Sequence, residues 1–243
     1  MSKFDSWMDL KNMSNSDAAM RYAEIVNKLV SLEDSSREEK GLSINQNMFK
    51  NLIFPRSSGG ISSLRLREIS LEISDGIVNL KLNRIPKKNA MNLLMWNELR
   101  EIFQAIERDE SVRVIIISGS GGNFSSGLDT SIFLEMRSTL ADVACESKKR
   151  EALKEFIRYL QLTISAIERC RVPVIASITG ICFGGALDLV AACDLVYCSS
   201  SARFSLKEID LAIVADLGSI QRLIKAIGLQ RTLELAYTGE LVF

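Results

Sequence analysis

Two short stretches near residue 70 alternate between apolar and polar positions, which is the pattern of half-buried β-strands. The segments LREISLEIS (66–74) and IVNLKLN (77–83) both alternate in this way. Asp75 and Gly76 stand between them and favour a tight two-residue turn. The sequence therefore predicts a β-hairpin here.

The spacing of apolar residues changes to three and four after a loop at 84–92. This periodicity predicts one helix, which Asn92 can cap at its N-terminus. Its packed face is expected to carry Leu93, Trp96, Leu99, Ile102, Phe103 and Ile106. The continuous run VRVIIIS (112–118) that follows is typical of a strand buried on both faces.

A strand, a glycine-rich turn and a helix then occur twice, which indicates an α/β fold. The strand at 112–118 leads into a turn at 119–133 and a helix at 134–170, with apolar residues three and four apart in its second half. The strand at 174–178 leads through Gly184 and Gly185 into an apolar helix at 186–192. Free backbone N–H groups at two such turns could converge on one point. Taken alone, the 119–133 segment is more typical of a plain loop, because it matches neither common phosphate-binding glycine motif.

Residues 1–60 differ in composition from the rest of the chain and are predicted to form an N-terminal extension. One amphipathic helix is expected at 17–32, followed by polar linkers that end at 57–60. The extension can be a weakly packed segment or a helix that docks to a partner. The main domain is expected to span 61–243.

Composition narrows the chemistry that the chain can perform. Thirty basic and thirty acidic residues cancel, so no charge excess points to nucleic acid, and no apolar window reaches the ~20 residues of a membrane span. The five cysteines form no CxxC pair, which favours a reduced compartment. The absence of histidine excludes Ser-His-Asp and Cys-His catalysis and disfavours a metal site. Acid–base work would fall mainly to carboxylates.

Several carboxylates lie in apolar surroundings, and each has a structural explanation as well as a functional one. Asp188, within an apolar helix, can be a buried cap or an ion pair. Glu208 alone would be read as a surface charge, and Asp216 could cap the helix at 220–227. Asp194 and Asp210 are taken as structural.

Four ordered segments resemble the enoyl-CoA hydratase/isomerase, or crotonase, superfamily, and the resemblance covers about residues 65–243. They are NAMN (89–92), NFSSGLDT (123–130), PVIASITGICFGGALDLVAACDL (173–195) and FSLKEIDLAIVADLGSIQRLIKAIG (204–228). The resemblance implies an α/β fold of repeated ββα units in a superhelix. It also implies that the backbone N–H groups of Leu128 and Gly185 form an oxyanion hole for an acyl-CoA thioester.

The acidic positions resemble those of the Δ(3,5)-Δ(2,4)-dienoyl-CoA isomerases within this superfamily. The resemblance implies isomerisation of 3,5-dienoyl-CoA to 2,4-dienoyl-CoA in fatty-acid β-oxidation. Glu208 and Asp216 would transfer protons at C2 and C6, in an order left open, and Asp188 would have a supporting electrostatic or orienting role. The alternatives are a hydratase or another isomerase of the superfamily, and an inactive member that acts as an interaction protein.

The resemblance also implies substrate contacts, assembly and location. The residues expected to contact the substrate are Ala90, Ser126, Gly127, Leu128, Asp129, Thr130 and Gly185. Basic residues of the 84–92 loop, namely Arg84, Lys87 and Lys88, suit the CoA phosphates, although a solvated loop explains each of them equally well. Coenzyme A is then part of the substrate, and no separate cofactor or metal is expected.

Members of the superfamily form homo-trimers or hexamers with a helical C-terminal region, which this chain is expected to lack because it ends at Phe243. The implied compartment is the mitochondrion or the peroxisome. No targeting signal is identifiable in the sequence.

Overall fold

The computed structural model describes residues 60–141 and 145–242. The helix predicted at 17–32 and almost all of the proposed N-terminal extension lie outside these residues. The boundary between the extension and the main domain therefore stays a prediction.

The predicted hairpin is confirmed. Strands β1 (Ile69–Ser74) and β2 (Ile77–Leu82) pair antiparallel. The turn between them has positive φ at both central residues, 51° at Asp75 and 78° at Gly76. Both residue types tolerate this left-handed conformation, so the turn fixes the register of the hairpin.

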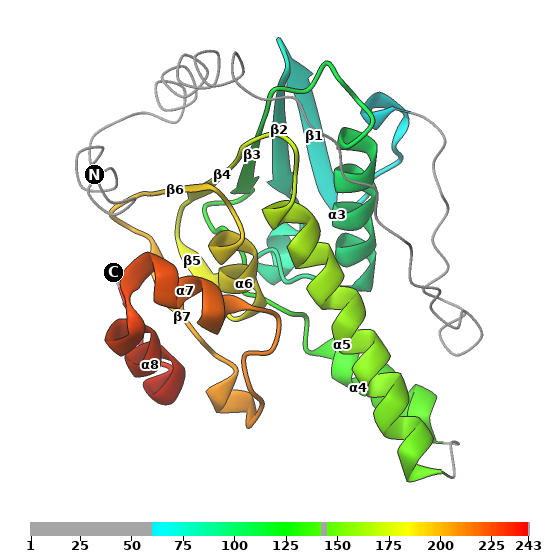
Figure 1. Cartoon of the computed structure of the whole chain (residues 1–243), viewed down its shortest axis with the longest axis vertical. Coiled ribbons are helices and arrows are strands. Elements are labelled where there is room, and N and C mark those ends of the chain that lie inside the picture. Colours follow the sequence, from blue (N-terminus) through cyan, green and yellow to red (C-terminus); the bar gives the residue numbers. More distant parts are fainter. Residues whose placement is uncertain (1–59, 142–144, 243) are drawn as a thin grey trace.

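The hairpin forms one edge of a five-stranded sheet with the order β1-β2-β3-β4-β6 (Figure 1). Strands β3 (Val114–Gly119), β4 (Val174–Ile178) and β6 (Leu195–Cys198) continue the sheet parallel to β2. All of β4 is buried. The strand predicted at 112–118 begins two residues later, because the backbone N–H of Val112 instead bonds to Asp109 and closes a turn.

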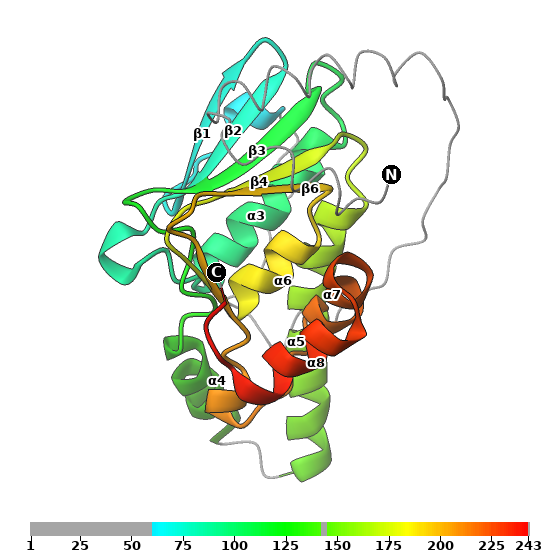
Figure 2. The same cartoon turned by 90° about the vertical axis from the view of Figure 1, so that its left-hand side faces the viewer.

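Three helices lie along one side of this sheet: α3 (Leu93–Ile106), α5 (Glu146–Glu168) and α6 (Gly185–Ala191) (Figure 2). Asn92 caps α3 as predicted, since its Oδ1 accepts a hydrogen bond from the Met95 N–H at 2.9 Å. The predicted apolar face of α3 enters the core, and Leu93 at its start is half-buried. Apolar residues of the sheet and these helices form one continuous core.

The prediction of a single helix at 134–170 is wrong. The structure has two helices instead, α4 (Ser131–Ala141) and α5. A side-chain oxygen of Asp129 accepts a hydrogen bond from the Ser131 N–H at 2.9 Å, so a helix begins earlier than its apolar periodicity suggested. Cys145 has an extended backbone immediately before α5, which is incompatible with one continuous helix.

A second, smaller pairing lies beyond β4, where β5 (Ile181–Phe183) and β7 (Arg203–Ser205) run parallel. The chain then forms a short 3-10 turn, η4 (Ile209–Leu211), and ends in α7 (Ser219–Ile227) and α8 (Leu229–Thr238). Two other 3-10 turns are η2 (Ile61–Ser63) and η3 (Ile85–Lys87).

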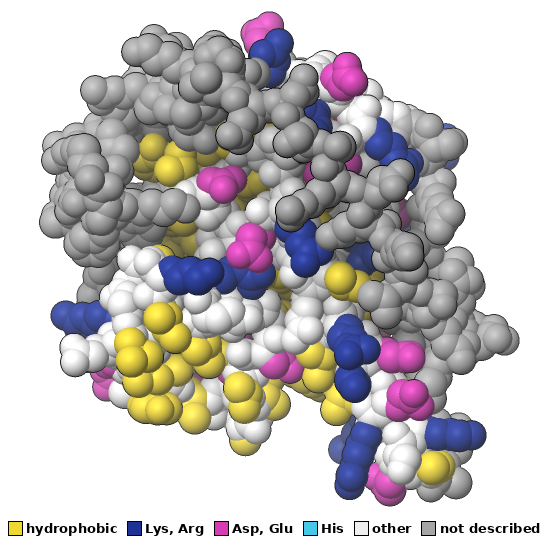
Figure 3. Space-filling view, viewed as in Figure 1, with side chains coloured by type: hydrophobic (Ala, Val, Ile, Leu, Met, Phe, Trp, Pro, Cys, Tyr) yellow, Lys and Arg dark blue, Asp and Glu magenta, His cyan; other side chains and the backbone are white. Residues whose placement is uncertain are grey.

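Exposed apolar side chains gather over α7 and α8, at the lower edge of the face in Figure 3. Those on the two helices and the residues that follow them are Ile224, Leu229, Tyr237 and Leu241. The segment around η4 exposes four more, Ile209, Leu211, Ile213 and Val214. Within the described residues, no helix has the length and apolar character needed to cross a membrane.

Candidate active site

Asn89 organises the loop that joins the hairpin to α3. Its side chain is fully buried and its φ is 56°, a left-handed conformation that asparagine tolerates better than most residues. The side-chain oxygen accepts a hydrogen bond from the Arg84 N–H, and the side-chain nitrogen donates to the carbonyls of Ser120, Asn123 and Phe124. Asn89 thus joins this loop to the glycine-rich turn after β3.

Ser125 extends the same connection toward the centre of the site. Its hydroxyl donates to the Asn89 carbonyl at 2.7 Å and accepts a hydrogen bond from the Gly127 N–H at 3.0 Å. Further along, Met91 and Leu128 form an isolated parallel bridge. The backbone on each side of Leu128 is therefore fixed by Met91, through Gly127 and Asp129.

Leu128 and Gly185 lie side by side because their segments run parallel. Ser125 bridges Cys182 of β5, and Leu128 and Gly185 each lie three residues further along. The proximity is direct, since a Cβ atom added at Gly185 would lie 3.6 Å from the Leu128 backbone nitrogen. Two loops that are distant in the sequence thus bring two backbone N–H groups to one point.

Both N–H groups are available to a ligand. Neither donates a hydrogen bond within residues 60–141 and 145–242. Gly185 is the first residue of α6, where N–H groups have no partner inside the helix. Gly127 is required beside them, because its φ is 90° and an added Cβ would lie 2.4 Å from the Phe183 carbonyl oxygen.

Asp188 follows on α6 and is fully buried. Its Oδ1 accepts a hydrogen bond from the Ser219 N–H at 2.6 Å, while its Oδ2 is buried with no hydrogen-bond partner among the described residues. Burial raises the pKa of Asp188 to about 7, and the negative charges of Glu208 and Asp216 add to this rise against the hydrogen bonds from Ser219. Asp188 therefore acts as a buried cap for the N-terminus of α7, which is one of the structural roles that the sequence allowed for it.

Glu208 does not have the fully exposed position that its polar neighbours suggested. It is half-buried, its Oε2 has no hydrogen-bond partner within the described residues, and its Oε1 would lie 3.2 Å from a Cβ added at Gly184. Burial raises the pKa of Glu208, and the charge of Asp216 raises it further. Glu208 thus lies beside the backbone that precedes Gly185.

Asp216 lies in an exposed segment between η4 and α7. It does not cap α7, because Gly218 is the N-cap residue and the Ser219 N–H bonds to Asp188. Partial desolvation raises the pKa of Asp216. Since the charge of Asp216 acts on both Asp188 and Glu208, the three carboxyl groups form one electrostatically coupled cluster.

The backbone before Glu208 is held on two sides. The Gly184 N–H donates to the Ser205 carbonyl at 2.9 Å, which joins β7 to the start of α6. On the other side, the Ser205 hydroxyl and the Lys207 Nζ both donate to the carbonyl of Gly239, just after α8. These bonds fix the direction from which Glu208 enters the site.

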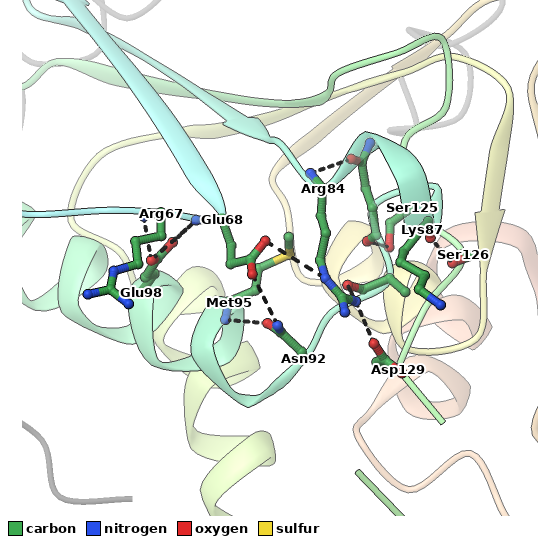
Figure 4. A network of polar contacts seen from close by, with 12 residues as sticks. Arg67, Glu68, Arg84, Lys87, Asn92, Met95, Glu98, Ser125, Ser126 and Asp129 are labelled. Atoms are coloured by element: carbon green, nitrogen blue, oxygen red, sulfur yellow. Dashed lines mark hydrogen bonds and ion pairs between the residues drawn. The ribbon is translucent and has the colours of Figure 1, made fainter. Parts of the chain in front are cut away.

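Arg84 is engaged by two carboxylates (Figure 4). Its guanidinium pairs closely with Asp129, lies 3.8 Å from Glu68, and donates to the Ala90 carbonyl. Burial raises the pKa of Asp129, but hydrogen bonds from Ser131 and Arg84 outweigh it and leave this pKa lowered. Lys87 and Lys88 of the same loop are exposed.

This geometry combines two free N–H donors with three carboxyl groups whose pKa values are raised. Donors of this kind stabilise an oxyanion, and carboxyl groups with raised pKa values can give or accept a proton near neutral pH. Among the described residues, no group of three or more acidic, cysteine or histidine side chains is arranged to hold a metal ion.

The model of one protein family, enoyl-CoA hydratase/isomerase, matches residues 72–242. The chain belongs to this family. The match includes both N–H donors and all three carboxylates, and it agrees with the resemblance seen in the sequence.

Curated relatives of this family member include proteins named Δ(3,5)-Δ(2,4)-dienoyl-CoA isomerase. A mitochondrial protein of Mus musculus is 44% identical over 156 residues, which are 63% of this chain and 47% of that protein. A peroxisomal protein of Arabidopsis thaliana is 40% identical over 180 residues, covering 74% of this chain and 65% of that protein. The chain thus spans about half to two thirds of the length of these relatives.

Solved structures of the family share the fold. An enoyl-CoA hydratase from Bacillus anthracis is 32% identical and has a TM-score of 0.61, covering 72% of this chain and 64% of that one. A Thermobifida fusca protein solved in complex with acetoacetyl-CoA is 28% identical, with a TM-score of 0.65 and coverage of 72% and 68%. The predicted crotonase-like α/β fold is therefore confirmed.

The residues predicted from the family resemblance to contact the substrate lie on neighbouring stretches of backbone in the structure. Ala90 lies beside the bridge of Met91 to Leu128, and the Ser126 N–H and hydroxyl bond to the carbonyls of Lys88 and Lys87. Thr130 is exposed. The side chain of Asp129 is occupied by Arg84 and by the start of α4, and its backbone N–H and carbonyl bond to Met91 and Ile132.

Sequence reasoning missed the residues that hold the site together. In the sequence, Asn89 is visible only as part of the NAMN segment, and no pattern distinguishes Ser125 or Ser219. A buried asparagine or serine leaves no periodic signal, because its partners are backbone groups far away in the chain. The best available hint for Asn89 was its place in a turn after two lysines.

Proposed function

We propose that this family member shifts the double bonds of a 3,5-dienoyl-CoA to give the 2,4-dienoyl-CoA. The observation that carries the proposal is the pair of N–H groups of Leu128 and Gly185, with Glu208 against Gly184. Asp188 follows three residues after Gly185, and the charge of Asp216 acts on both of these carboxyl groups. The chain contains no histidine, so carboxylates are its natural acid–base groups. The names of the curated relatives support the same reaction.

The thioester oxygen of the substrate would lie between the two N–H donors. One carboxylate removes a proton from C2, and the electrons of that C–H bond form the C1=C2 bond of a conjugated trienolate with the negative charge on the oxygen. A carboxylic acid then gives a proton to C6, and the electrons return to form the conjugated product. The two donors stabilise the charged intermediate, and each is worth about 10²–10³ in rate in comparable sites.

Glu208 and Asp216 are proposed to perform the two transfers. One acid–base group cannot easily reach both C2 and C6, so two carboxyl groups are needed. Their mutual repulsion favours a state in which one holds a proton while the other is ionised. Which of them acts at C2 is left open.

The hydrogen bond between Asp188 and the Ser219 N–H favours isomerisation over hydration. A hydratase of this family would use the positions of Asp188 and Glu208 to deliver water. Here Oδ1 of Asp188 already accepts the Ser219 N–H and supports the start of α7. We therefore assign Asp188 an orienting and electrostatic role.

The test is an assay of the full chain with 3,5-dienoyl-CoA, in which the conjugated product is followed by its absorbance. We expect turnover by the wild type and a loss of about 10²–10⁴-fold in Asp216→Asn. Asp210→Asn is the matched control, because Asp210 lies nearby in η4 and its side chain forms an exposed ion pair with Lys207. Hydration of a 2-enoyl-CoA without isomerisation would instead identify a hydratase, and a folded chain that binds no acyl-CoA in calorimetry would identify an interaction protein.

We also propose a CoA site, a compartment and an assembly state. Exposed Lys87 and Lys88 suit the CoA phosphates, whereas Arg84 is neutralised by carboxylates. The names of the relatives favour the mitochondrion or the peroxisome. Assembly into homo-trimers or hexamers stays a prediction, which the exposed apolar residues over α7 and α8 support and sedimentation of the full chain would measure.

A further inference from the structure

Asp216 stands on a segment without regular secondary structure. Residues 212–218 connect η4 to α7, and most of their side chains are exposed. A proton-transfer group must be held within a fraction of an ångström of its working position, and a displacement of about 1 Å can cost 10²-fold in rate. Something outside this segment has to provide that precision.

Gln161 on α5 supplies a direct contact to it. Its Nε2 donates a hydrogen bond to the backbone carbonyl of Asp216 at 2.7 Å, across 55 residues of sequence. The neighbouring α5 residues Leu160 and Ile164 are buried in the core. Gln161 therefore extends from a well-anchored helix to the backbone of the residue that bears the carboxyl group.

The same helix also holds the far end of the segment. Arg222 of α7 donates to the carbonyl of Gly218 at 3.2 Å, and its guanidinium pairs with Glu168 of α5 at 2.6 Å. Gln161 and Glu168 lie two turns apart on α5. One helix thus fixes both Asp216 and the start of α7.

We propose that Gln161 is a positioning residue for Asp216, which sets the reach of that carboxyl group by fixing its backbone carbonyl. The inference rests on the proposed function for its effect on turnover. Gln161 does not touch the reacting atoms in this scheme, and its contribution passes entirely through Asp216. The first residues of the segment are tied to η4 instead, because the N–H groups of Ala212 and Ile213 donate to the carbonyls of Ile209 and Glu208. Neither of these bonds involves Asp216.

The activity test compares Gln161→Met, which keeps the length and removes the donor, with Gln161→Lys, which restores a donor. We expect kcat to fall about 10-fold in Gln161→Met with KM unchanged, and to recover partly in Gln161→Lys. Gln104→Met is the matched control, because Gln104 is an exposed glutamine on α3. Gln161→Met should have no further effect on the residual rate of Asp216→Asn, since its role requires that carboxylate. Wild-type kcat in Gln161→Met, or an equal loss in both backgrounds, would overturn the proposal.

A second readout does not depend on turnover. Amide hydrogen exchange of residues 212–218 should be faster in Gln161→Met than in the wild type and unchanged in Gln104→Met. If the wild type converts no dienoyl-CoA but this exchange difference appears, the proposed function fails while the positioning contact stands. Unchanged exchange in Gln161→Met overturns the positioning role whatever the reaction is.

Discussion

Asp188 on α6 and Ser219 on α7 are joined by a hydrogen bond of 2.6 Å from the Ser219 N–H to the Asp188 carboxylate. Asp188 lies three residues after Gly185, one of the two free N–H donors, and Ser219 lies three residues after Asp216. The bond therefore connects the part of the site that would bind the thioester to the part that would move protons.

Replacing Asp188 separates its role as an acceptor from its role as a charge. Asparagine keeps an oxygen for the Ser219 N–H, whereas alanine leaves that buried N–H without a partner at a cost of about 1–3 kcal/mol. We expect Asp188→Ala to lower both the melting temperature and turnover, and Asp188→Asn to avoid the loss in melting temperature and to retain much more of the turnover. Equal loss of turnover in the two stable variants would show that the charge, and not the hydrogen bond, matters.

The stability of the protein should also depend on pH through Asp188. Its pKa is raised from 3.8 to about 7 in the fold, mainly by burial, so the folded protein binds a proton more tightly than the unfolded chain. Ionisation of Asp188 therefore lowers the free energy of unfolding. This loss is absent below the unfolded pKa of 3.8, grows as pH rises, and reaches its full size above the folded pKa of about 7.

Asp188→Asn removes this ionisation. Its melting temperature should exceed that of the wild type at pH 8, by about 2–4 °C for each kcal/mol relieved, and the two should converge near pH 4. Thermal unfolding of the wild type and of Asp188→Asn between pH 4 and pH 8 measures this difference. A constant difference at all pH values would mean that Asp188 does not titrate in this way.

The elements that follow local patterns were predictable, and those set by distant contacts were not. The hairpin at Asp75 and Gly76 and the helix capped by Asn92 depend on neighbouring residues, so the sequence was enough. The break between α4 and α5 depends on the extended backbone of Cys145, which has no strong local signal.

The candidate site shows the same division. Leu128 and Gly185 could be named because the family resemblance includes their motifs, and the register of Ser125 with Cys182 explains why they meet. The contact of Gln161 with Asp216 could not be predicted, because it joins a helix surface to a backbone carbonyl 55 residues away. No periodicity records such a bond.

Gly185→Ala tests the space between the two donors. The added methyl group would lie 3.6 Å from the Leu128 nitrogen and 3.4 Å from Met91 Cε, where it fits the fold but narrows the space beside the N–H group that is proposed to bind the substrate oxygen. We expect a loss of about 10²-fold or more in kcat/KM with a small change in melting temperature. Gly60→Ala is the control, because the one described atom that a Cβ there would meet belongs to Asp109, at 3.7 Å. Unimpaired turnover in Gly185→Ala would exclude a ligand oxygen at this position.

Asn89→Ala should destabilise the protein without directly touching the chemistry. The substitution leaves the Arg84 N–H and three backbone carbonyls without their partner and places alanine at a φ of 56°. We expect a loss of about 2–4 kcal/mol in the free energy of unfolding, measured by urea denaturation. Asn83→Ala, at an exposed position just before the loop, should change this free energy by less than about 0.5 kcal/mol. Similar values for the two variants would remove Asn89 from its organising role.

The coupling of Glu208 and Asp216 predicts a shift in the pH dependence of the remaining activity. The charge of Asp216 contributes to the raised pKa of Glu208, so Asp216→Asn should lower that pKa toward its ordinary value. If Glu208 acts as the base in the residual reaction, the acid limb of kcat/KM then moves to lower pH, because Glu208 stays ionised in more acidic solution. The measurement is the residual rate across the acidic range in Asp216→Asn and in the Asp210→Asn control. With Glu208 as the base, an acid limb that stays in place would show that the two carboxyl groups titrate independently, and proton transfer by a coupled pair would have to be abandoned.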